Sequence, residues 1–338
     1  MPMKRTVLLL ISLGALLCAC NRPPSGVKPI GVIFETDMGN DVDDALAADM
    51  LFKYSREGDI ELLGMCLNKD WEESKEYMDI LFTWYGRPDL PLGVVHDGAS
   101  YADDENCYAS KVCRLQDEEG KPLFPRSREE YASLPDAVNL YRELLSGRQD
   151  ASVDIISVGF STNLSRLLCS EPDDKSPLPG KDLIQAKVRR LVVMAGNFDG
   201  RGFSEFNVVK DIPSAKNVLE NWPTELVITP SELGEKILFP ASAIEEADPP
   251  TPVTEGYKAF QPMPYDRQTW DLTAVLFAVE GPEWFTLSPS GTVTVTEDGR
   301  TLFAENPEGK CKYLMVNDLQ ADAIRNRFIG LFKQAYVR

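Results

Sequence analysis

The sequence predicts a single α/β domain built on an open, mainly parallel β-sheet flanked by helices. Apolar runs alternate with longer runs of helical character along residues 30–338. The apolar runs are continuous, which is typical of parallel strands buried on both faces. The 338 residues include 43% hydrophobic residues, enough for one large core. No internal repeat or interior linker divides the chain, so we expect one domain.

The first residues are predicted to lie outside this domain. A positive pair precedes a short apolar run, residues 6–17, which is typical of a secretory signal. The Leu-Cys-Ala-Cys sequence that ends at Cys20 resembles a bacterial lipobox. We therefore expect residues 1–19 to be a lipoprotein signal peptide and residues 20–29 to be a flexible tether behind a lipidated Cys20. The alternative is an ordinary signal peptide that contains cysteine.

This N-terminus predicts a lipid-anchored protein of the bacterial cell envelope, on the periplasmic side or the outer membrane. The formal net charge of −18 argues against nucleic acid as a partner, because backbone binding requires a basic surface. Five cysteines follow Cys20, and Cys107 and Cys113 are close enough in sequence to pair in an oxidising compartment. No Cys-x-x-Cys motif occurs, so a zinc or redox site is not supported.

The expected elements follow one another along the chain. Strands are predicted at residues 31–34, 60–67, 92–95, 154–158, 190–194 and 225–228. Helices are predicted at residues 44–54, 72–85, 136–145, 163–168 and 214–221. The charged segment 101–134 is expected to be an insertion loop, and the proline-rich segment 245–264 another loop or a lid. Residues 292–296 and 300–303, joined through an Asp-Gly turn, predict a hairpin.

An acidic turn follows the first predicted strand. It carries five carboxylates, those of Glu35, Asp37, Asp41, Asp43 and Asp44. Like charges at this density repel one another unless a cation or a hydrogen-bonding ligand neutralises them, and hard oxygen ligands suit Ca²⁺ or Mg²⁺. The alternative is a solvated loop in which Asp43 or Asp44 caps the next helix. The position at the carboxyl end of a strand favours a metal site.

Later strand ends also carry polar residues. Asn68 follows the second predicted strand, where it can bind a hydroxyl or cap a helix. Thr162 follows a tight turn whose backbone carbonyl can ligate calcium, although this residue is also a plausible N-cap. Glu205 and Asn207 flank Phe206 on a segment taken as extended, where residues two apart face the same side. They could grip vicinal hydroxyls while Phe206 packs beneath them.

A late carboxylate completes the pattern. Asp271 begins an apolar helix, either as an N-cap or as a ligand. Taken in order over about residues 31–280, these segments resemble the inosine-uridine-preferring nucleoside hydrolase family. That family shows strand–Asp-x-Asp-Pro-Gly-x-Asp-Asp–helix, then Gly-x-x-Thr-Asn, then Val-Met-Gly-Gly leading to Glu-Phe-Asn, and finally Asp at the start of a helix.

The resemblance implies a Rossmann-like nucleoside hydrolase fold, Ca²⁺, a nucleoside or related N-riboside as substrate, and a dimer or tetramer. Asp37 matches the metal-binding residue that also activates the attacking water. Asp44, Asp271 and the backbone carbonyl of Thr162 match the remaining metal ligands. The residues with implied contacts to the sugar are Asp43, Asn68, Met194, Asn197, Glu205 and Asn207.

The opening turn departs from the family pattern. Glu35 stands where Asp is usual, and Met38 where Pro is usual. Two additional residues separate Asp37 from Asp44, so Asp41 could take one of the assigned roles.

The leaving-group side departs further. Many family members place His directly before the late Asp, as an acid for the departing base. Here that position is Trp270, a candidate for stacking on the base. The single histidine, His96, ends a predicted strand and could approach the site or be an ordinary loop residue.

The sequence therefore predicts calcium-dependent hydrolysis of the N-glycosidic bond of ribonucleosides or related N-ribosides. Positive charge that develops on the sugar would be stabilised by the carboxylates. The alternative is a non-catalytic surface lipoprotein that binds ribose or a nucleoside. A phosphotransferase of the haloacid dehalogenase type is disfavoured, because Glu35 occupies the place of its nucleophilic Asp and no phosphate-binding Lys is evident.

Overall fold

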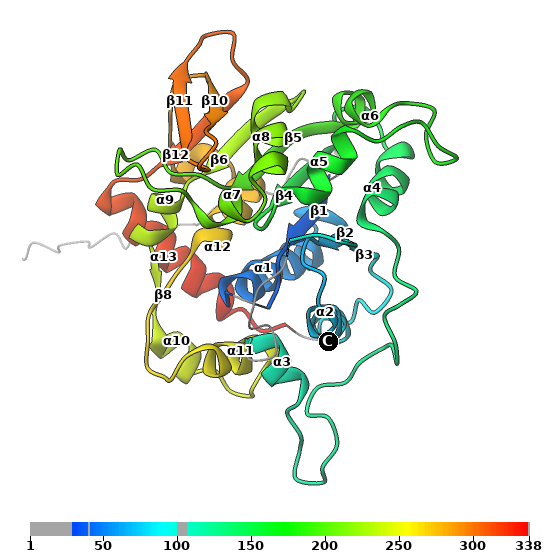
Figure 1. Ribbon diagram of the computed structural model, residues 1–338. Helices are drawn as coiled ribbons and strands as arrows, with labels where there is room; N and C mark the ends of the chain where they lie inside the picture. Colours follow the sequence, from blue (N-terminus) through cyan, green and yellow to red (C-terminus); the bar gives the residue numbers. More distant parts are fainter. Residues whose placement is uncertain (1–28, 40, 100–106, 337–338) are drawn as a thin grey trace, which may run out of the picture.

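The computed structural model describes residues 29–39, 41–99 and 107–336 (Figure 1). The predicted signal peptide, Cys20 and all of the predicted tether except its last residue lie outside the described residues. Among the helices that are described, none has both the length and the apolar character needed to cross a membrane.

The described chain alternates strands and helices, as predicted. The strands are β1 (Ile30–Thr36), β2 (Ile60–Leu67), β3 (Leu92–Val94), β4 (Val153–Ser157), β5 (Val188–Met194), β6 (Glu225–Thr229), β7 (Leu238–Phe239), β8 (Arg267–Gln268), β9 (Thr286–Leu287), β10 (Gly291–Val295), β11 (Thr301–Glu305) and β12 (Cys311–Met315).

The helices lie between and after these strands. They are α1 (Asp43–Glu57), α2 (Glu72–Trp84), α3 (Tyr108–Cys113), α4 (Ala137–Ser146), α5 (Thr162–Leu168), α6 (Gly180–Lys187), α7 (Phe206–Lys210), α8 (Ile212–Asn221), α9 (Ser231–Lys236), α10 (Ala241–Glu245), α11 (Pro252–Phe260), α12 (Trp270–Glu280), the short 3-10 helix η2 (Pro282–Trp284) and α13 (Asp318–Phe332).

Within the described residues, ten strands form one sheet in the order β11-β10-β12-β6-β5-β4-β1-β2-β3, with β9 beside β12. The run from β12 to β3 is parallel, whereas β9 and β10 are antiparallel to β12 and β11 is antiparallel to β10. The chain order reverses between β1 and β4. Open α/β sheets bind ligands at such a switch point, beyond the carboxyl ends of the strands.

Helices cover both faces of the sheet (Figure 1). One hydrophobic cluster joins the sheet to α1, α2, α11, α12 and α13, and a second joins it to α4, α5, α6 and α8. Phe34 of β1 belongs to the first cluster and its neighbour Ile33 to the second, because successive strand residues face opposite sides. Burial on both faces explains the continuous apolar sequence of this strand and confirms the predicted single α/β domain.

The structure confirms each predicted strand and helix, and the predicted hairpin is β10 and β11. Both long loop predictions are wrong in part. Segment 101–134 contains the short helix α3, which packs with α2 and α11, although residues 101–106 are not described. Segment 245–264 contains α11, which begins at Pro252 behind a Thr251–Thr254 capping box. The proline that suggested a loop is the first residue of a helix, where its missing N–H costs nothing.

Cys107 and Cys113, which are close enough in sequence to pair, do not form a disulfide, since both are free thiols. They lie at opposite ends of α3. Six residues of helix separate them by about 9 Å along the axis, which is beyond the Cα separation that a disulfide spans. Cys107 Sγ instead lies 3.2 Å from Ser110 Oγ, and Cys113 Sγ donates to the Glu73 carbonyl.

Candidate active site

The turn after β1 carries buried carboxylates. Asp37 is 6% exposed, and Asp43 and Asp44, in the first turn of α1, are each 1% exposed. Val42 occupies the N-cap position, and no side chain caps this helix. The alternative in which Asp43 or Asp44 serves as the N-cap is therefore wrong. Their carboxylates are available for other partners.

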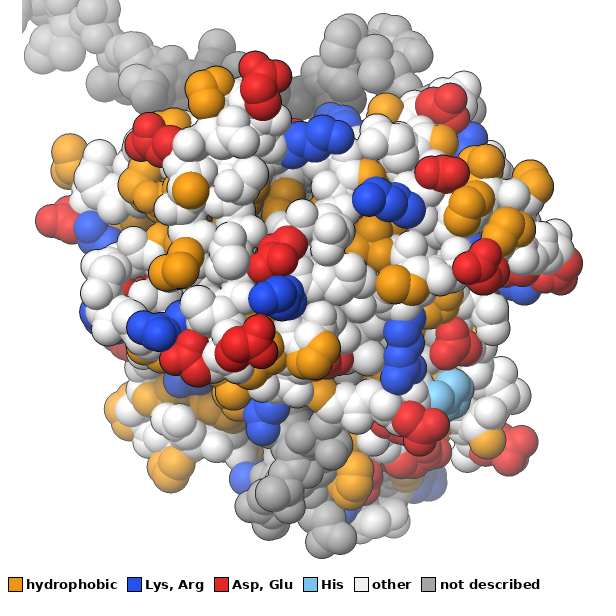
Figure 2. Space-filling view, turned by 45° about the horizontal axis from the view of Figure 1, so that its top comes forward, with side chains coloured by type: hydrophobic (Ala, Val, Ile, Leu, Met, Phe, Trp, Pro, Cys, Tyr) orange, Lys and Arg blue, Asp and Glu red, His pale blue; other side chains and the backbone are white. Residues whose placement is uncertain are grey.

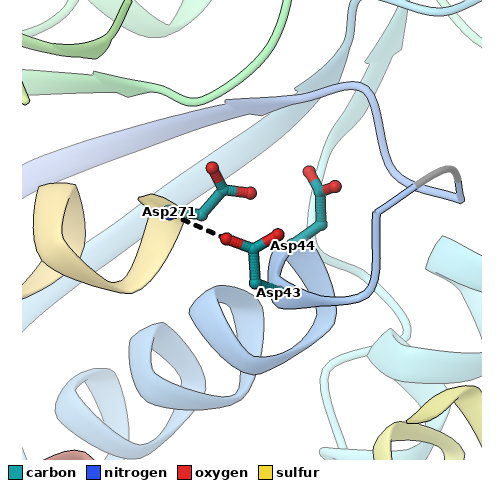
Figure 3. A group of neighbouring side chains, drawn as sticks. All are labelled: Asp43, Asp44 and Asp271. Atoms are coloured by element: carbon teal, nitrogen blue, oxygen red, sulfur yellow. Dashed lines mark hydrogen bonds between the residues drawn. The ribbon is translucent and has the colours of Figure 1, made fainter. Parts of the chain in front are cut away.

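A third carboxylate, from a distant part of the chain, joins them. Asp271 lies in the first turn of α12, and one oxygen each of Asp43, Asp44 and Asp271 lies within 4.8 Å of the others (Figure 3). The backbone N–H of Asp271 donates to Asp43 Oδ2 over 3.0 Å, and Thr36 Oγ1 donates to Asp44. The packing of α12 against α1 creates this acidic cluster.

Burial raises the pKa of Asp43, Asp44 and Asp271 well above the ordinary range for Asp. Repulsion among neighbouring carboxylates raises it further, with Asp37 contributing to the shifts at Asp44 and Asp271. Three buried carboxylates held this close together are unfavourable without a cation. All of the donors are oxygen atoms, which fits a hard divalent cation.

Asp41 faces a different partner. Arg267, in β8, donates to both of its oxygens, with Nε 2.9 Å from Oδ1. Asp43 points into the acidic cluster instead. This arrangement favours the assignment of the sugar-side role to Asp43 and leaves Asp41 as the counterion of Arg267.

A cavity of about 340 Å³ opens beside the acidic cluster. Its described lining consists of Asp37, Asp41, Asp43, Asp44, Val158, Met194, Phe203, Glu205, Phe206, Asn207, Ser231, Glu235, Trp270 and Asp271. Ten residues singled out from the sequence are therefore brought together: Asp37, Asp41, Asp43, Asp44, Met194, Glu205, Phe206, Asn207, Trp270 and Asp271.

Glu205 and Asn207 reach this cavity from a helix start and not from the extended segment that we predicted. Glu205 is the N-cap of α7 and accepts hydrogen bonds from the backbone N–H groups of Gly196, Asn207 and Val208. Burial raises the pKa of Glu205 to about 7, although these hydrogen bonds oppose the shift. The Asn207 amide donates to the carbonyls of Val158 and Met194.

Phe206 does not pack beneath these two side chains, contrary to our expectation. The start of α7 turns it outward, so it is 46% exposed and lines the cavity. Phe203 is 42% exposed and lines it as well. Both rings lie beside cationic side chains, Lys210 at Phe206 and Arg201 at Phe203.

Three residues with assigned roles lie outside the cavity lining among the described residues. Asn68 is fully buried and donates to Glu35, and Asn197 donates to Ser231 and Glu232. Thr162 begins α5, and its hydroxyl donates to Asp211. The roles of these three residues stay predictions.

Gly159 brings the turn after β4 against the turn after β1. A Cβ atom at this position would lie 2.6 Å from Asn68 Oδ1 and 2.7 Å from the Asp37 nitrogen. Only glycine permits this close approach without displacement of the backbone. The turn after β4 therefore lies directly against the backbone of Asp37, which lines the cavity.

The cavity lining also contains Phe203, Ser231 and Glu235, to which the sequence analysis assigned no role. The Trp270 Nε1 donates to the Ser231 carbonyl over 2.9 Å, and the indole packs on Gly234, where a Cβ would lie 2.3 Å from Trp270 Cδ1. His96 is an exposed loop residue, outside the described cavity lining. The loop interpretation of His96 is therefore confirmed.

The sequence matches the model of the inosine-uridine preferring nucleoside hydrolase family over residues 32–326. The chain belongs to this family. The resemblance inferred from the motifs is thereby confirmed, and the chain is an N-glycosidase by family. A comparison with curated proteins found no match.

Solved structures of nucleoside hydrolases share the fold. A plant nucleoside hydrolase has a TM-score of 0.68 at 16% identity, covering 90% of this chain and 98% of its own. The inosine-uridine preferring nucleoside hydrolase from Bacillus anthracis has a TM-score of 0.68 at 18% identity, covering 90% and 100%. The purine-preferring ribonucleoside hydrolase from Gardnerella vaginalis has a TM-score of 0.65 at 16% identity, covering 90% and 100%. At these identities the similarity establishes the fold of the chain.

Proposed function

We propose that this nucleoside hydrolase cleaves the N-glycosidic bond of ribonucleosides or related N-ribosides, with Ca²⁺ as its metal and Asp37 as the base that activates water. One observation carries the proposal. The buried cluster of Asp43, Asp44 and Asp271 opens into the same cavity as Asp37 and Glu205. A hard cation and a polyhydroxyl ligand fit side by side in such a site.

The donor chemistry supports calcium. Asp44 and Asp271 would hold the ion, together with Asp37 and the backbone carbonyl of Thr162, and all of these donors are oxygen atoms. When bound, calcium supplies positive charge that lowers the pKa of a neighbouring water and fixes the vicinal hydroxyls of the sugar. Burial of the carboxylates strengthens their interaction with such a cation.

The residues of this chain divide the remaining tasks. Asp37 takes a proton from the attacking water, whose oxygen then bonds to C1′ of the sugar. The C1′–N bond breaks through an oxocarbenium-like state, and the surrounding carboxylates stabilise its positive charge. Asp43, Glu205 and Asn207 hold the ribose hydroxyls, and their own hydrogen bonds fix them in place.

Release of free ribose from a panel of nucleosides, measured with added calcium and with a chelator, tests this proposal. Asp37→Asn is expected to lower kcat by about 10³-fold, because it removes the base. Asp322→Asn, an exposed carboxylate on α13, is the control and should retain full activity. Folded, calcium-loaded protein that hydrolyses no N- or O-riboside would contradict the proposal. Tight riboside binding without ribose release would favour the non-catalytic lipoprotein instead.

We also propose that the protein is anchored in the bacterial envelope through a lipidated Cys20, on the periplasmic side or the outer membrane. The apolar signal-like run and the lipobox-like sequence support this. Incorporation of labelled fatty acid into the wild-type chain, but not into Cys20→Ala, is the expected result. Labelling of both chains would show that Cys20 is not the acceptor. The dimer or tetramer implied by the family is testable by sedimentation.

A further inference from the structure

The cavity lining is strongly acidic. Seven described lining residues carry a carboxyl group: Asp37, Asp41, Asp43, Asp44, Glu205, Glu235 and Asp271. None of the described lining residues is Lys or Arg. On the face of the molecule that Figure 2 shows, by contrast, acidic and basic side chains are interspersed. The carboxylates remain in excess even after a divalent cation and the arginines bound to Asp41 and Glu235 are counted. A cavity with this excess favours a positively charged ligand.

The same lining is poor in groups that could protonate a departing base. It contains no His, Tyr, Cys or Lys among the described residues. The carboxylates at the mouth act as hydrogen-bond acceptors, Asp41 from Arg267 and Glu235 from Arg201 over 2.8 Å. Glu205 uses both of its oxygens to accept from backbone N–H groups.

The neutral donors in the described lining are engaged in part. The Trp270 Nε1 donates to the Ser231 carbonyl, and the Asn207 amide donates to the carbonyls of Val158 and Met194. The walls of the mouth are aromatic, formed by Phe203, Phe206 and Trp270. Aromatic faces attract cations, and each of these rings already has one beside it. Arg267 lies 5.1 Å from the Trp270 centroid, Arg201 5.5 Å from that of Phe203 and Lys210 5.0 Å from that of Phe206. A flat, positively charged ring therefore matches both the walls and the charge of this mouth.

We propose that the preferred substrates are N-ribosides whose base carries its positive charge on the glycosidic nitrogen, the N-ribosylpyridinium class. This inference rests on the proposed function and names the substrate class of that same site. When C1′–N breaks, the bonding electron pair returns to the ring nitrogen, which becomes neutral and needs no proton. Water adds its oxygen to C1′, and the proton released passes through Asp37 to solvent. A neutral purine nucleoside would require an additional proton on its leaving nitrogen.

Nicotinamide riboside, inosine, uridine and p-nitrophenyl β-ribofuranoside form the diagnostic panel, assayed with the full-length protein and calcium. We expect kcat/KM for nicotinamide riboside to exceed that for inosine and for uridine by about 100-fold, the lower range of what a general acid supplies. Inosine or uridine cleaved as well as nicotinamide riboside would overturn the inference.

The nitrophenyl riboside separates the two proposals. It is an uncharged substrate, so it gains nothing from a site that attracts cations, and its leaving group departs without a proton. If it is hydrolysed and nicotinamide riboside is not, the inference fails and the proposed function stands. If no member of the panel is hydrolysed, the proposed function fails and the inference fails with it.

The Glu235→Gln variant tests the recognition of charge. Loss of this carboxylate should lower the ratio of kcat/KM for nicotinamide riboside to that for the nitrophenyl riboside by about tenfold, since an attraction to the cationic ring is removed. Glu246→Gln removes an exposed carboxylate that pairs with Lys333 outside the described lining, and should leave the ratio unchanged. An unchanged ratio in Glu235→Gln would show that charge at the mouth does not select the substrate.

Discussion

Buried carboxylates at the two ends of the parallel strands have opposite environments. Asp154, near the start of β4, is fully buried and accepts hydrogen bonds from Arg189 and Arg190. Asp43 and Asp44 lie beyond the carboxyl ends of the strands, in the acidic cluster with Asp271. Within the described residues, no Lys or Arg forms an ion pair with Asp43, Asp44 or Asp271.

The difference separates structure from function. The charge of a buried carboxylate is balanced when two arginines bind it. Such a carboxylate becomes destabilising when those arginines are removed. A buried cluster of carboxylates without basic partners carries unbalanced negative charge until a ligand supplies positive charge. The predictions below test this contrast, from the largest expected effect to the smallest.

Removal of one carboxylate from the acidic cluster should abolish activity while it strengthens the metal-free fold. Asp271→Asn is expected to lower kcat by about 10³-fold, because it removes a ligand and an electrostatic contact to the transition state. Thermal unfolding in chelator should occur at a higher temperature than in wild type, since one repelling charge is gone. Activity within tenfold of wild type would contradict the assignment of Asp271 to the site.

Removal of the paired carboxylate should have the reverse effect. Asp154→Asn leaves Arg189 and Arg190 without their buried acceptor and should cost about 3 kcal/mol of unfolding free energy, measured with urea. The kcat per folded molecule should stay at the wild-type value. Glu61→Gln breaks the exposed pair with Arg148 and serves as control, with an expected loss under about 1 kcal/mol.

Calcium should stabilise the wild-type protein through the acidic cluster. At about 100 times its dissociation constant, the ion is expected to add about 2.7 kcal/mol to the free energy of unfolding. Asp154→Asn should keep this increment and Asp271→Asn should lose it. The same increment in both variants would place the ion elsewhere.

A third kind of buried carboxylate has only neutral partners. Glu35, at the end of β1, accepts from Asn68 and Tyr141, and burial raises its pKa from 4.5 to about 7. Glu35 therefore binds its proton more tightly in the folded state than in the unfolded state. The stability that this difference contributes is complete below pH 4.5 and is lost as the pH rises through 7. Between pH 6 and pH 8, ionisation of Glu35 should lower the free energy of unfolding by about 1.4 kcal/mol.

Urea unfolding of wild type and Glu35→Gln at both pH values measures this contribution. The variant should show the smaller decline. Part of the decline should remain, because burial also raises the pKa of Glu205 to about 7, with the same sign. Equal declines in both proteins would mean that Glu35 ionises normally in the folded state.

Residues with local, periodic signals were predictable from the sequence. The continuous apolar runs predict the central strands. The acidic turn and Asp271 predict most of the polar residues in the cavity lining. Helix α11 was missed because proline composition was taken to indicate a loop, although Thr251 and Pro252 are typical helix-start residues. The short helix α7 is not predicted for a related reason, since an extended segment was expected around Glu205, which is an N-cap.

The walls of the cavity were not predictable in the same way. Phe203 and Glu235 come from different segments, the loop between β5 and α7 and the helix α9, yet both line the same cavity. Arg267 becomes the partner of Asp41 across 226 positions of sequence. Such pairings depend on tertiary packing, and no local pattern of residues encodes them.

The hydrogen bond from the Asp271 backbone to Asp43 spans 228 positions of the chain. The acidic cluster that this contact helps to build therefore forms only after the late helix α12 has docked on the early helix α1. Loop-closure entropy makes contacts of this separation slow to form. A chain that ends before residue 271 lacks one carboxylate of the acidic cluster, so it should not show the stabilisation by calcium that we expect of the whole chain.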